Sequence, residues 1–216
     1  VKTLMQQPCR FETKNMEAVE GALRKGQPVI FFSGHYGNWE VSYLPLSQKN
    51  YPINLVGLDH GGPLINFLLD SNRINQNVRM IIKGRPGIRN LIKAIQNGEV
   101  IGALVDQYAS DGQMLSLFDM PAKTPLGLAK LAVRYQTLFV PVQVIRKGQT
   151  SRFKVIFHPA IDIPDEPDQT RAAMIMMQQA HHYFEGWVRD HPEQWLWLHN
   201  RWKQKHKKEK KCRNRH

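Results

Sequence analysis

The stretch "QPVIFFSGHYGNWE" (residues 27–40) gives the first indication of the fold. Its apolar part, 27–32, is rich in β-branched and aromatic residues and is bounded by Gly26 and Gly34, which predicts a buried strand. The residues that follow bring a histidine, an asparagine, a tryptophan and a glutamate in quick succession. A titratable pair, His35 and Glu40, therefore stands at the end of a buried strand.

Strands and helices are expected to alternate along the rest of the chain. The further strands are expected at 53–58, 78–82, 99–105, 138–145 and 152–159. The helices are expected at 37–48, 63–76, 87–98, 124–136 and 168–189, with Asn38 able to cap the first. The last two strands are expected to form an antiparallel hairpin. This order predicts an α/β fold, a largely parallel (mixed) central sheet with helices on both faces.

The length of 216 residues suits one domain with a continuous core. We expect that domain over residues 1–200 and a basic tail over residues 201–216. No run approaches the roughly 18 apolar residues of a membrane span, and no signal-peptide pattern opens the chain. The chain begins at Val1 rather than Met, so we expect that an N-terminal piece precedes it. Two distant cysteines fit neither a disulfide framework nor a zinc site, which favours a reducing cytoplasm.

The formal net charge of +12 is concentrated at the C-terminal end. Residues 201–216 hold nine Lys or Arg against the single Glu209, a net of +8 that leaves +4 for the rest. Such a run can be a solvated tail, or it can bind an anionic membrane surface, where each basic residue contributes about 1 kcal/mol. Nucleic acid is not an expected partner, because Trp202 is the one aromatic residue there and no recognition element accompanies it.

Candidate catalytic residues follow two of the expected strands. Ligands bind at the carboxyl ends of strands in open α/β sheets, and both His35 and the pair Asp106-Gln107 fall there. Glu40 lies five steps along the chain from His35, roughly 140° around a regular helix, so the two cannot share one helix face. A His35 in the preceding loop can still act as a base while Glu40 holds its other ring nitrogen. The alternative is a helix-capping histidine and a glutamate paired with a surface lysine.

Four blocks of sequence resemble one known family. They are "GHYGNWE" (34–40), "VDQ" (105–107), "FDMPAKTPLGLAKLA" (118–132) and "HPEQWLWLHNRWK" (191–203). Together, and in this order over about residues 20–203, they resemble the late acyltransferases of lipid A biosynthesis, the lauroyl and myristoyl transferases. The HxxxxE spacing is loose by itself, but the four blocks together are specific.

The resemblance implies transfer of a fatty acyl chain from acyl carrier protein to a hydroxyl on an acylated lipid A precursor, at the cytoplasmic face of the bacterial inner membrane. His35 matches the family's catalytic histidine, and Glu40 matches its acidic partner. A well-placed base contributes about 10² to 10⁴ in rate. A thioester is already activated, so neither a cofactor, a metal ion nor a covalent enzyme intermediate is expected.

Other residues are assigned to the substrate through the same resemblance. Arg73 matches an arginine expected to bind the oxyanion or the substrate, and Arg85 is a weaker candidate for a phosphate contact. A surface salt bridge is the alternative for each arginine. Asp106 and Gln107 match a "DQ" element that either contacts substrate or stabilises the loop around the site. Asn38 is counted with the substrate site, where it and Trp39 are expected to shape the turn.

Some features leave the function open. The family normally carries an N-terminal hydrophobic anchor, which this sequence lacks, so either the sequence is a fragment or surface patches and the basic tail reach the membrane. The acceptor can be another glycolipid or a glycerolipid, although Glu40 in place of aspartate disfavours a glycerolipid. A non-catalytic protein that binds anionic lipid or nucleic acid is the third hypothesis. Four tryptophans near the C-terminal end can form an interfacial belt or pack in the core: Trp187, Trp195, Trp197 and Trp202.

Overall fold

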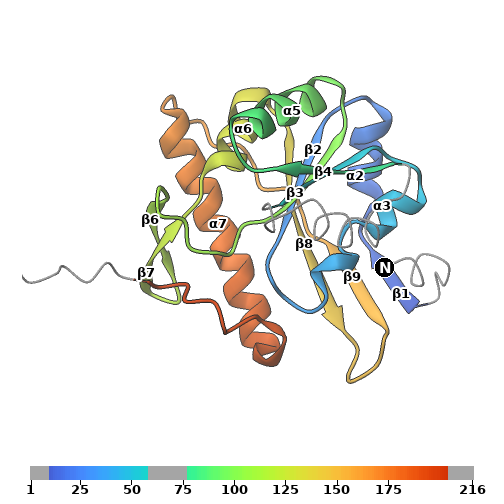
Figure 1. The fold of residues 1–216 in the computed structure, drawn as a ribbon, viewed down its shortest axis with the longest axis vertical. Helices are drawn as coiled ribbons and strands as arrows, with labels where there is room; N and C mark the ends of the chain where they lie inside the picture. Colours follow the sequence, from blue (N-terminus) through green and yellow to red (C-terminus); the bar gives the residue numbers. More distant parts are fainter. Residues whose placement is uncertain (1–9, 58–76, 204–216) are drawn as a thin grey trace, which may run out of the picture.

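The computed structural model describes residues 10–57 and 77–203. A seven-stranded sheet forms the centre of the described part, in the order β1-β9-β8-β2-β5-β3-β4 (Figure 1). Its strands are β1 (Phe11–Lys14), β2 (Val29–Ser33), β3 (Ile53–Gly57), β4 (Val78–Ile82), β5 (Val100–Leu104), β8 (Leu138–Arg146) and β9 (Phe153–Phe157). A separate two-stranded hairpin pairs β6 (Gln113–Leu117) with β7 (Met120–Thr124).

The central sheet is mixed but mostly parallel, as predicted. Each neighbouring pair of its strands runs parallel except β8 and β9, which form the expected antiparallel hairpin. All five residues of β2 are buried. Strands covered on both faces have continuous apolar runs of this kind, which is why residues 27–32 show no polar alternation.

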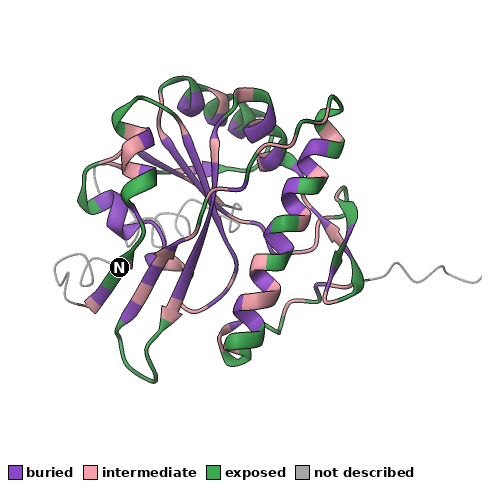
Figure 2. Cartoon of the chain, turned by 180° about the vertical axis from the view of Figure 1, so that it is seen from behind, coloured by how far each residue is buried: buried purple, intermediate pink, exposed green. Residues whose placement is uncertain are grey.

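Helices cover both faces of the sheet, which confirms the predicted fold class. They are α2 (Glu17–Arg24), α3 (Leu44–Gln48), α5 (Arg85–Gln96), α6 (Gly127–Tyr135) and α7 (Gln169–Asp190). Side chains of β2 alternate between two cores, with Val29 and Phe31 packing with α2 and α3, and Ile30 and Phe32 packing with the other three helices. Figure 2 shows the buried strands at the centre and helices that are buried along one side.

The expected helix at 37–48 is wrong as a single element. A short 3₁₀ helix, η2 (Trp39–Val41), comes first, and α3 then begins at Leu44 with Pro45 in its first turn. Proline has no backbone N–H to donate inside a helix, so it favours a new helical start at this point. Asn38 occupies the N-cap position of η2 but its side chain makes no capping hydrogen bond.

Among the described strands and α-helices, four were not predicted: β1, α2 and the hairpin strands β6 and β7. The hairpin turn places Phe118 and Asp119 at positive φ, 53° and 58°. Such turns usually carry Asn-Gly or Asp-Gly, so this one lacks the usual signal in the sequence. The expected helix at 63–76 lies outside the described residues. Within the described part, no helix is both long enough and apolar enough to cross a membrane.

Candidate active site

The carboxyl ends of β2 and β5 bring the two main candidates together. These strands are parallel neighbours, with Ser33 opposite Leu104 in the register. His35 lies two residues beyond the end of β2, and Asp106 lies two residues beyond the end of β5. The prediction that both residues occupy the same edge of the sheet is therefore confirmed.

His35 is bound to Asp106 through both its backbone and its ring. The backbone N–H donates to Oδ2 of Asp106 at 2.8 Å, and Nδ1 of the ring lies 2.7 Å from Oδ1. An ionised carboxylate only accepts hydrogen bonds, so Nδ1 carries a proton. In the neutral ring, Nε2 then has the lone pair that a general base needs.

Asp106 is buried, with 4% of its surface exposed, and is nevertheless held in its charged form. Burial raises the pKa of this carboxyl, but hydrogen bonds from His35 and from the indole of Trp195 outweigh that effect and leave the pKa below its usual value. The close approach also restricts Gly34, because a Cβ there would lie 3.0 Å from Oδ2 of Asp106.

The expectation that Glu40 holds the second ring nitrogen of His35 is wrong. Asp106 takes that nitrogen and also accepts the backbone N–H of His35, so it binds the loop that carries the histidine. Glu40 belongs to η2 and lines the same pocket as His35.

Gln107 lies on the other side of the imidazole. Its side-chain Nε2 is 3.3 Å from Nε2 of His35, so the amide N–H can donate to the ring nitrogen that Asp106 leaves free. Gln107 also lines the pocket. The adjacent residues Asp106 and Gln107 therefore contact opposite nitrogens of one histidine.

A cavity of about 290 Å³ opens beside His35. Its floor is a row of four residues on one face of the sheet, in the strand order β2, β5, β3 and β4: Phe31, Gly102, Leu55 and Met80. A Cβ on Gly102 would lie 2.2 Å from the ring of Phe31, so this ring fills the space above the glycine. Polar groups, among them those of His35, Glu40, Lys83 and Gln107, also line the cavity, which therefore joins an apolar floor to polar side chains.

The ring of Trp39 packs edge-on against the imidazole of His35, with 4.9 Å between centroids and 61° between planes. Trp39 also lines the pocket. It was expected only to shape the turn, and its contact with the histidine was missed. The signal in the sequence that could have indicated this contact was the position of Trp39 in the motif "GHYGNWE", four residues after His35.

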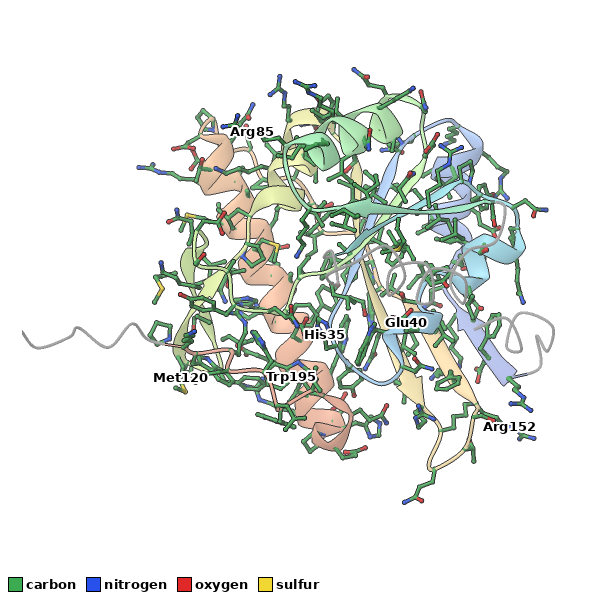
Figure 3. All side chains as sticks on the ribbon, in the orientation of Figure 1. His35, Glu40, Arg85, Met120, Arg152 and Trp195 are labelled. Atoms are coloured by element: carbon green, nitrogen blue, oxygen red, sulfur yellow. The ribbon has the colours of Figure 1, made fainter. Side chains whose placement is uncertain are left out.

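Neither of the two remaining substrate candidates in the described part of the chain lines this pocket. Arg85 is exposed in the first turn of α5 and lies well away from His35 (Figure 3). Lys83, two residues earlier, lines the pocket instead. Asn38 is adjacent to Trp39, but the described lining residues do not include it. Arg73 lies outside the described residues.

Two residues that the sequence placed in the basic tail are packed in the fold. Arg201 is 1% exposed, and the indole of Trp202 donates to the backbone carbonyl of Leu117. Trp195, left open between a lipid-interface belt and packing, is also buried and donates from Nε1 to Oδ2 of Asp106 at 3.0 Å. No pattern in the sequence pointed to that hydrogen bond, since 89 residues separate its partners.

No group of three or more His, Cys, Asp or Glu side chains within residues 10–57 and 77–203 is placed to hold a metal ion. The described site consists of His35, its hydrogen-bonded neighbours Asp106 and Gln107, and the pocket beside them.

Comparison with known proteins gives the family to which this α/β chain belongs. The model of the bacterial lipid A biosynthesis acyltransferases matches residues 6–204, and the chain belongs to that family.

Curated relatives are distant but similar over most of this chain. A lipid A biosynthesis acyltransferase of Haemophilus influenzae is 24% identical over 88% of this chain and 58% of its own. A lipid A biosynthesis palmitoleoyltransferase of Escherichia coli is 23% identical over 89% of this chain and 61% of its own. A phosphatidylinositol mannoside acyltransferase of Mycobacterium tuberculosis is 23% identical over 87% and 58%. The chain thus spans less than two thirds of the length of these relatives.

Proposed function

We propose that this chain transfers a fatty acyl group from acyl carrier protein to a hydroxyl of an acylated lipid A precursor, with His35 as the general base. The observation that carries the proposal is the hydrogen bond from Nδ1 of His35 to the buried carboxylate of Asp106, at the edge of a pocket with an apolar floor. Membership of the lipid A acyltransferase family supports the reaction class.

The proposed reaction moves one proton and exchanges one bond. Nε2 of His35 takes the proton of the acceptor hydroxyl as its oxygen attacks the thioester carbonyl carbon and forms the new C–O bond. The tetrahedral intermediate then collapses and the C–S bond breaks. The imidazolium returns its proton to the departing thiolate. Asp106, ionised and fixed on Nδ1, stabilises the positive ring between these two steps.

Gln107 and Glu40 are proposed to contact the substrates. Gln107 lies where a hydroxyl must approach Nε2 of His35, so its amide can bind the acceptor oxygen. Glu40 lines the same pocket, where its carboxylate can accept a hydrogen bond from a sugar or acyl hydroxyl. Arg73 remains our candidate for stabilising the oxyanion, which needs a cationic or N–H donor.

The pocket suits the acyl chain of the donor or acceptor. Phe31, Leu55 and Met80 give it an apolar floor, and Lys83 offers a cation that suits a phosphate. The net charge of +12 favours encounter with an acidic carrier protein and with anionic lipid. We also propose that the reaction takes place at the cytoplasmic face of the bacterial inner membrane, and we propose no cofactor.

A second acceptor class is favoured by one comparison. The mycobacterial phosphatidylinositol mannoside acyltransferase is similar to this chain at nearly the same identity and over nearly the same residues as the lipid A enzymes. The acceptor can therefore be a mannosylated phospholipid instead of a lipid A precursor. The chemistry at His35 is the same for both.

Product mass tests the proposal and separates the two acceptors. The chain in detergent is mixed with an acyl carrier protein bearing a defined acyl chain and with either a Kdo-bearing tetra-acylated lipid A precursor or a phosphatidylinositol mannoside. We expect the lipid A precursor to gain the mass of one acyl group. Acylation of the mannoside alone would show that the acceptor belongs to the second class and would overturn the lipid A assignment. Absence of acylation on both lipids would contradict it.

A further inference from the structure

A segment from the C-terminal part of the chain, residues 194–201, borders the site, and we call it the closing segment. Gly37 donates its backbone N–H to the carbonyl of Gln194 at 2.8 Å, and Leu196 donates to the carbonyl of His35 at 2.9 Å. Between these bonds, Tyr36 and Trp195 form an antiparallel bridge. The backbone of the loop after β2, which carries His35, is therefore held by residues about 160 positions away.

The closing segment also reaches the loop after β5. The indole N–H of Trp195 donates to Oδ2 of Asp106 at 3.0 Å, and the backbone N–H of Tyr108 donates to Nε2 of His199 at 2.9 Å. Both loops that carry the histidine–carboxylate pair are thus fixed to the same segment.

The two oxygens of the Asp106 carboxylate accept hydrogen bonds from three N–H groups. Oδ2 accepts from the indole of Trp195 and from the backbone N–H of His35, whereas Oδ1 faces Nδ1 of the His35 ring. With two donors on Oδ2, the carboxylate cannot rotate without losing one of them. Oδ1 therefore stays directed at Nδ1 of the imidazole.

The indole itself is held firmly. Trp195 is 8% exposed and packs edge-on against Trp197 at 4.6 Å and Trp202 at 5.9 Å between ring centroids. At the far end of the closing segment, Arg201 donates to the carbonyl of Lys123 and to Oγ1 of Thr124, each at 2.6 Å. The position of the indole N–H is thus set by the fold and does not require a bound substrate.

We propose that Trp195 is a positioning residue for acyl transfer, which fixes Asp106 so that its carboxylate orients the base His35. This inference rests on the proposed function. In this role Trp195 contacts neither the reacting atoms nor the substrate, and it acts through Asp106.

Two phenylalanine variants in the same segment form a matched pair. Trp195→Phe removes the indole N–H from Asp106, whereas Trp197→Phe removes one that donates to the carbonyl of Pro192 at 2.7 Å. We expect kcat to fall about 10-fold in Trp195→Phe with KM within about twofold, the scale typical of a lost partner behind a catalytic group. Trp197→Phe keeps an aromatic ring against Trp195 and leaves the hydrogen bond to Asp106 in place, so it should keep both constants near those of the unchanged chain. Equal effects of the two variants on kcat would overturn the proposal.

A double-mutant cycle tests whether Trp195 acts through the carboxylate. In an Asp106→Asn background, Trp195→Phe should cost nothing further, because the group it positions is gone. A full 10-fold additional loss in that background would contradict a role through Asp106. If Trp195→Phe fails to fold, benzothienylalanine at position 195 keeps the bicyclic shape without the N–H and decides the same question.

An NMR readout separates failure of this inference from failure of the proposed function. The Nδ1 proton of His35, assigned by its loss in His35→Ala, is observed without substrate. We expect its exchange with water to quicken in Trp195→Phe and to stay unchanged in Trp197→Phe, whichever lipid the enzyme uses. Unchanged exchange in both variants would overturn the positioning role even if acyl transfer is established.

Discussion

The two ring nitrogens of His35 have different surroundings, and that difference decides what the residue can do. Nδ1 is bonded to the buried Asp106, while Nε2 faces Gln107 in the pocket. The pKa of Asp106 is lowered because hydrogen bonds from His35 and Trp195 outweigh its burial, so the carboxylate stays charged and acts as an acceptor. A single tautomer follows from this arrangement, with the basic nitrogen toward the pocket.

Exchange of the two acidic residues for amides should separate their roles. In Asp106→Asn the new amide can donate to Nδ1 of His35, which favours the tautomer with its proton on Nε2. That nitrogen can then no longer accept a proton, so we predict a fall in kcat of about 10³- to 10⁴-fold. Glu40→Gln leaves the tautomer intact, so we predict a loss below about 100-fold that appears mainly in KM. Steady-state kinetics with one acyl donor measures both. A larger fall in kcat for Glu40→Gln would identify Glu40 as the partner of the histidine.

The sequence was informative about which residues lie at the site and less so about how they pair. His35, Asp106 and Gln107 each follow a buried apolar run, and parallel strands end at one edge of a sheet, so their meeting could be predicted. The partner of Nδ1 could not, because it comes from a strand about 70 residues away rather than from the nearby Glu40. The role of Trp195 depends on tertiary contacts in the same way.

The loop after β2, which carries His35, is shaped by its close approach to strand β8. Gly37 has φ of 60°, and a Cβ at this position would lie 2.1 Å from the carbonyl oxygen of Val144. No side chain fits between these two backbones. The loop after β2 therefore needs glycine for both conformation and space.

Two glycine variants isolate the effect of that contact. Gly148 also has positive φ, 56°, but no atom lies within 4 Å of its added Cβ. We predict that Gly148→Ala lowers the free energy of unfolding by about 1 kcal/mol, from backbone strain alone. Gly37→Ala should cost at least about 3 kcal/mol and also reduce kcat. Urea denaturation measures both, and equal losses would contradict a tight contact with Val144.

Elements with a strong periodic pattern were predicted correctly, and those with an unusual turn were not. The central strands and the long helix α7 (Gln169–Asp190) follow from apolar runs and spacing. The β6–β7 hairpin was missed because Phe118 and Asp119 replace the usual glycine-containing turn. The helix expected at 37–48 failed because Pro45 favours a new start.

For the whole molecule, a buried polar cluster links three parts of the chain. His181 of α7 has Nδ1 2.6 Å from the carbonyl of Ser116, and its Nε2 lies 3.3 Å from Nη2 of Arg201. Thr124 of β7 completes the cluster, with Oγ1 3.1 Å from Nε2 of His181. Burial lowers the pKa of His181 to about 4, so the imidazole is neutral in the folded chain at ordinary pH.

This cluster should make stability depend on pH. His181 in the unfolded chain binds a proton with the ordinary pKa of 6.5, whereas in the fold it stays neutral down to about 4. Acidification through that window therefore favours unfolding, and the contribution of His181 is on the order of 3 kcal/mol. His181→Asn should show a smaller loss of unfolding free energy from pH 6.5 to 4, and the exposed His182→Asn should not. Parallel pH curves for the unchanged chain and His181→Asn would contradict the assignment.

Charge over the whole chain bears on its partners. With a net charge of +12, we predict that kcat/KM for an acylated carrier protein falls as salt is raised from 50 to about 300 mM, because screening weakens long-range attraction. An uncharged acyl thioester, acyl-N-acetylcysteamine, serves as the control and should lose little. An equal salt dependence for both donors would argue against electrostatic recognition of the carrier.

The role of His35 as general base is tested most directly by the single-turnover rate of thioester consumption in His35→Ala, measured beside His182→Ala with saturating acceptor. The exposed His182 belongs to α7 and is not among the residues that line the pocket in the described part of the chain. If His35 is the general base, its loss slows the step by at least about 100-fold, while His182→Ala retains the rate of the unchanged chain. A rate in His35→Ala within a few-fold of that in His182→Ala would show that His35 is not the general base.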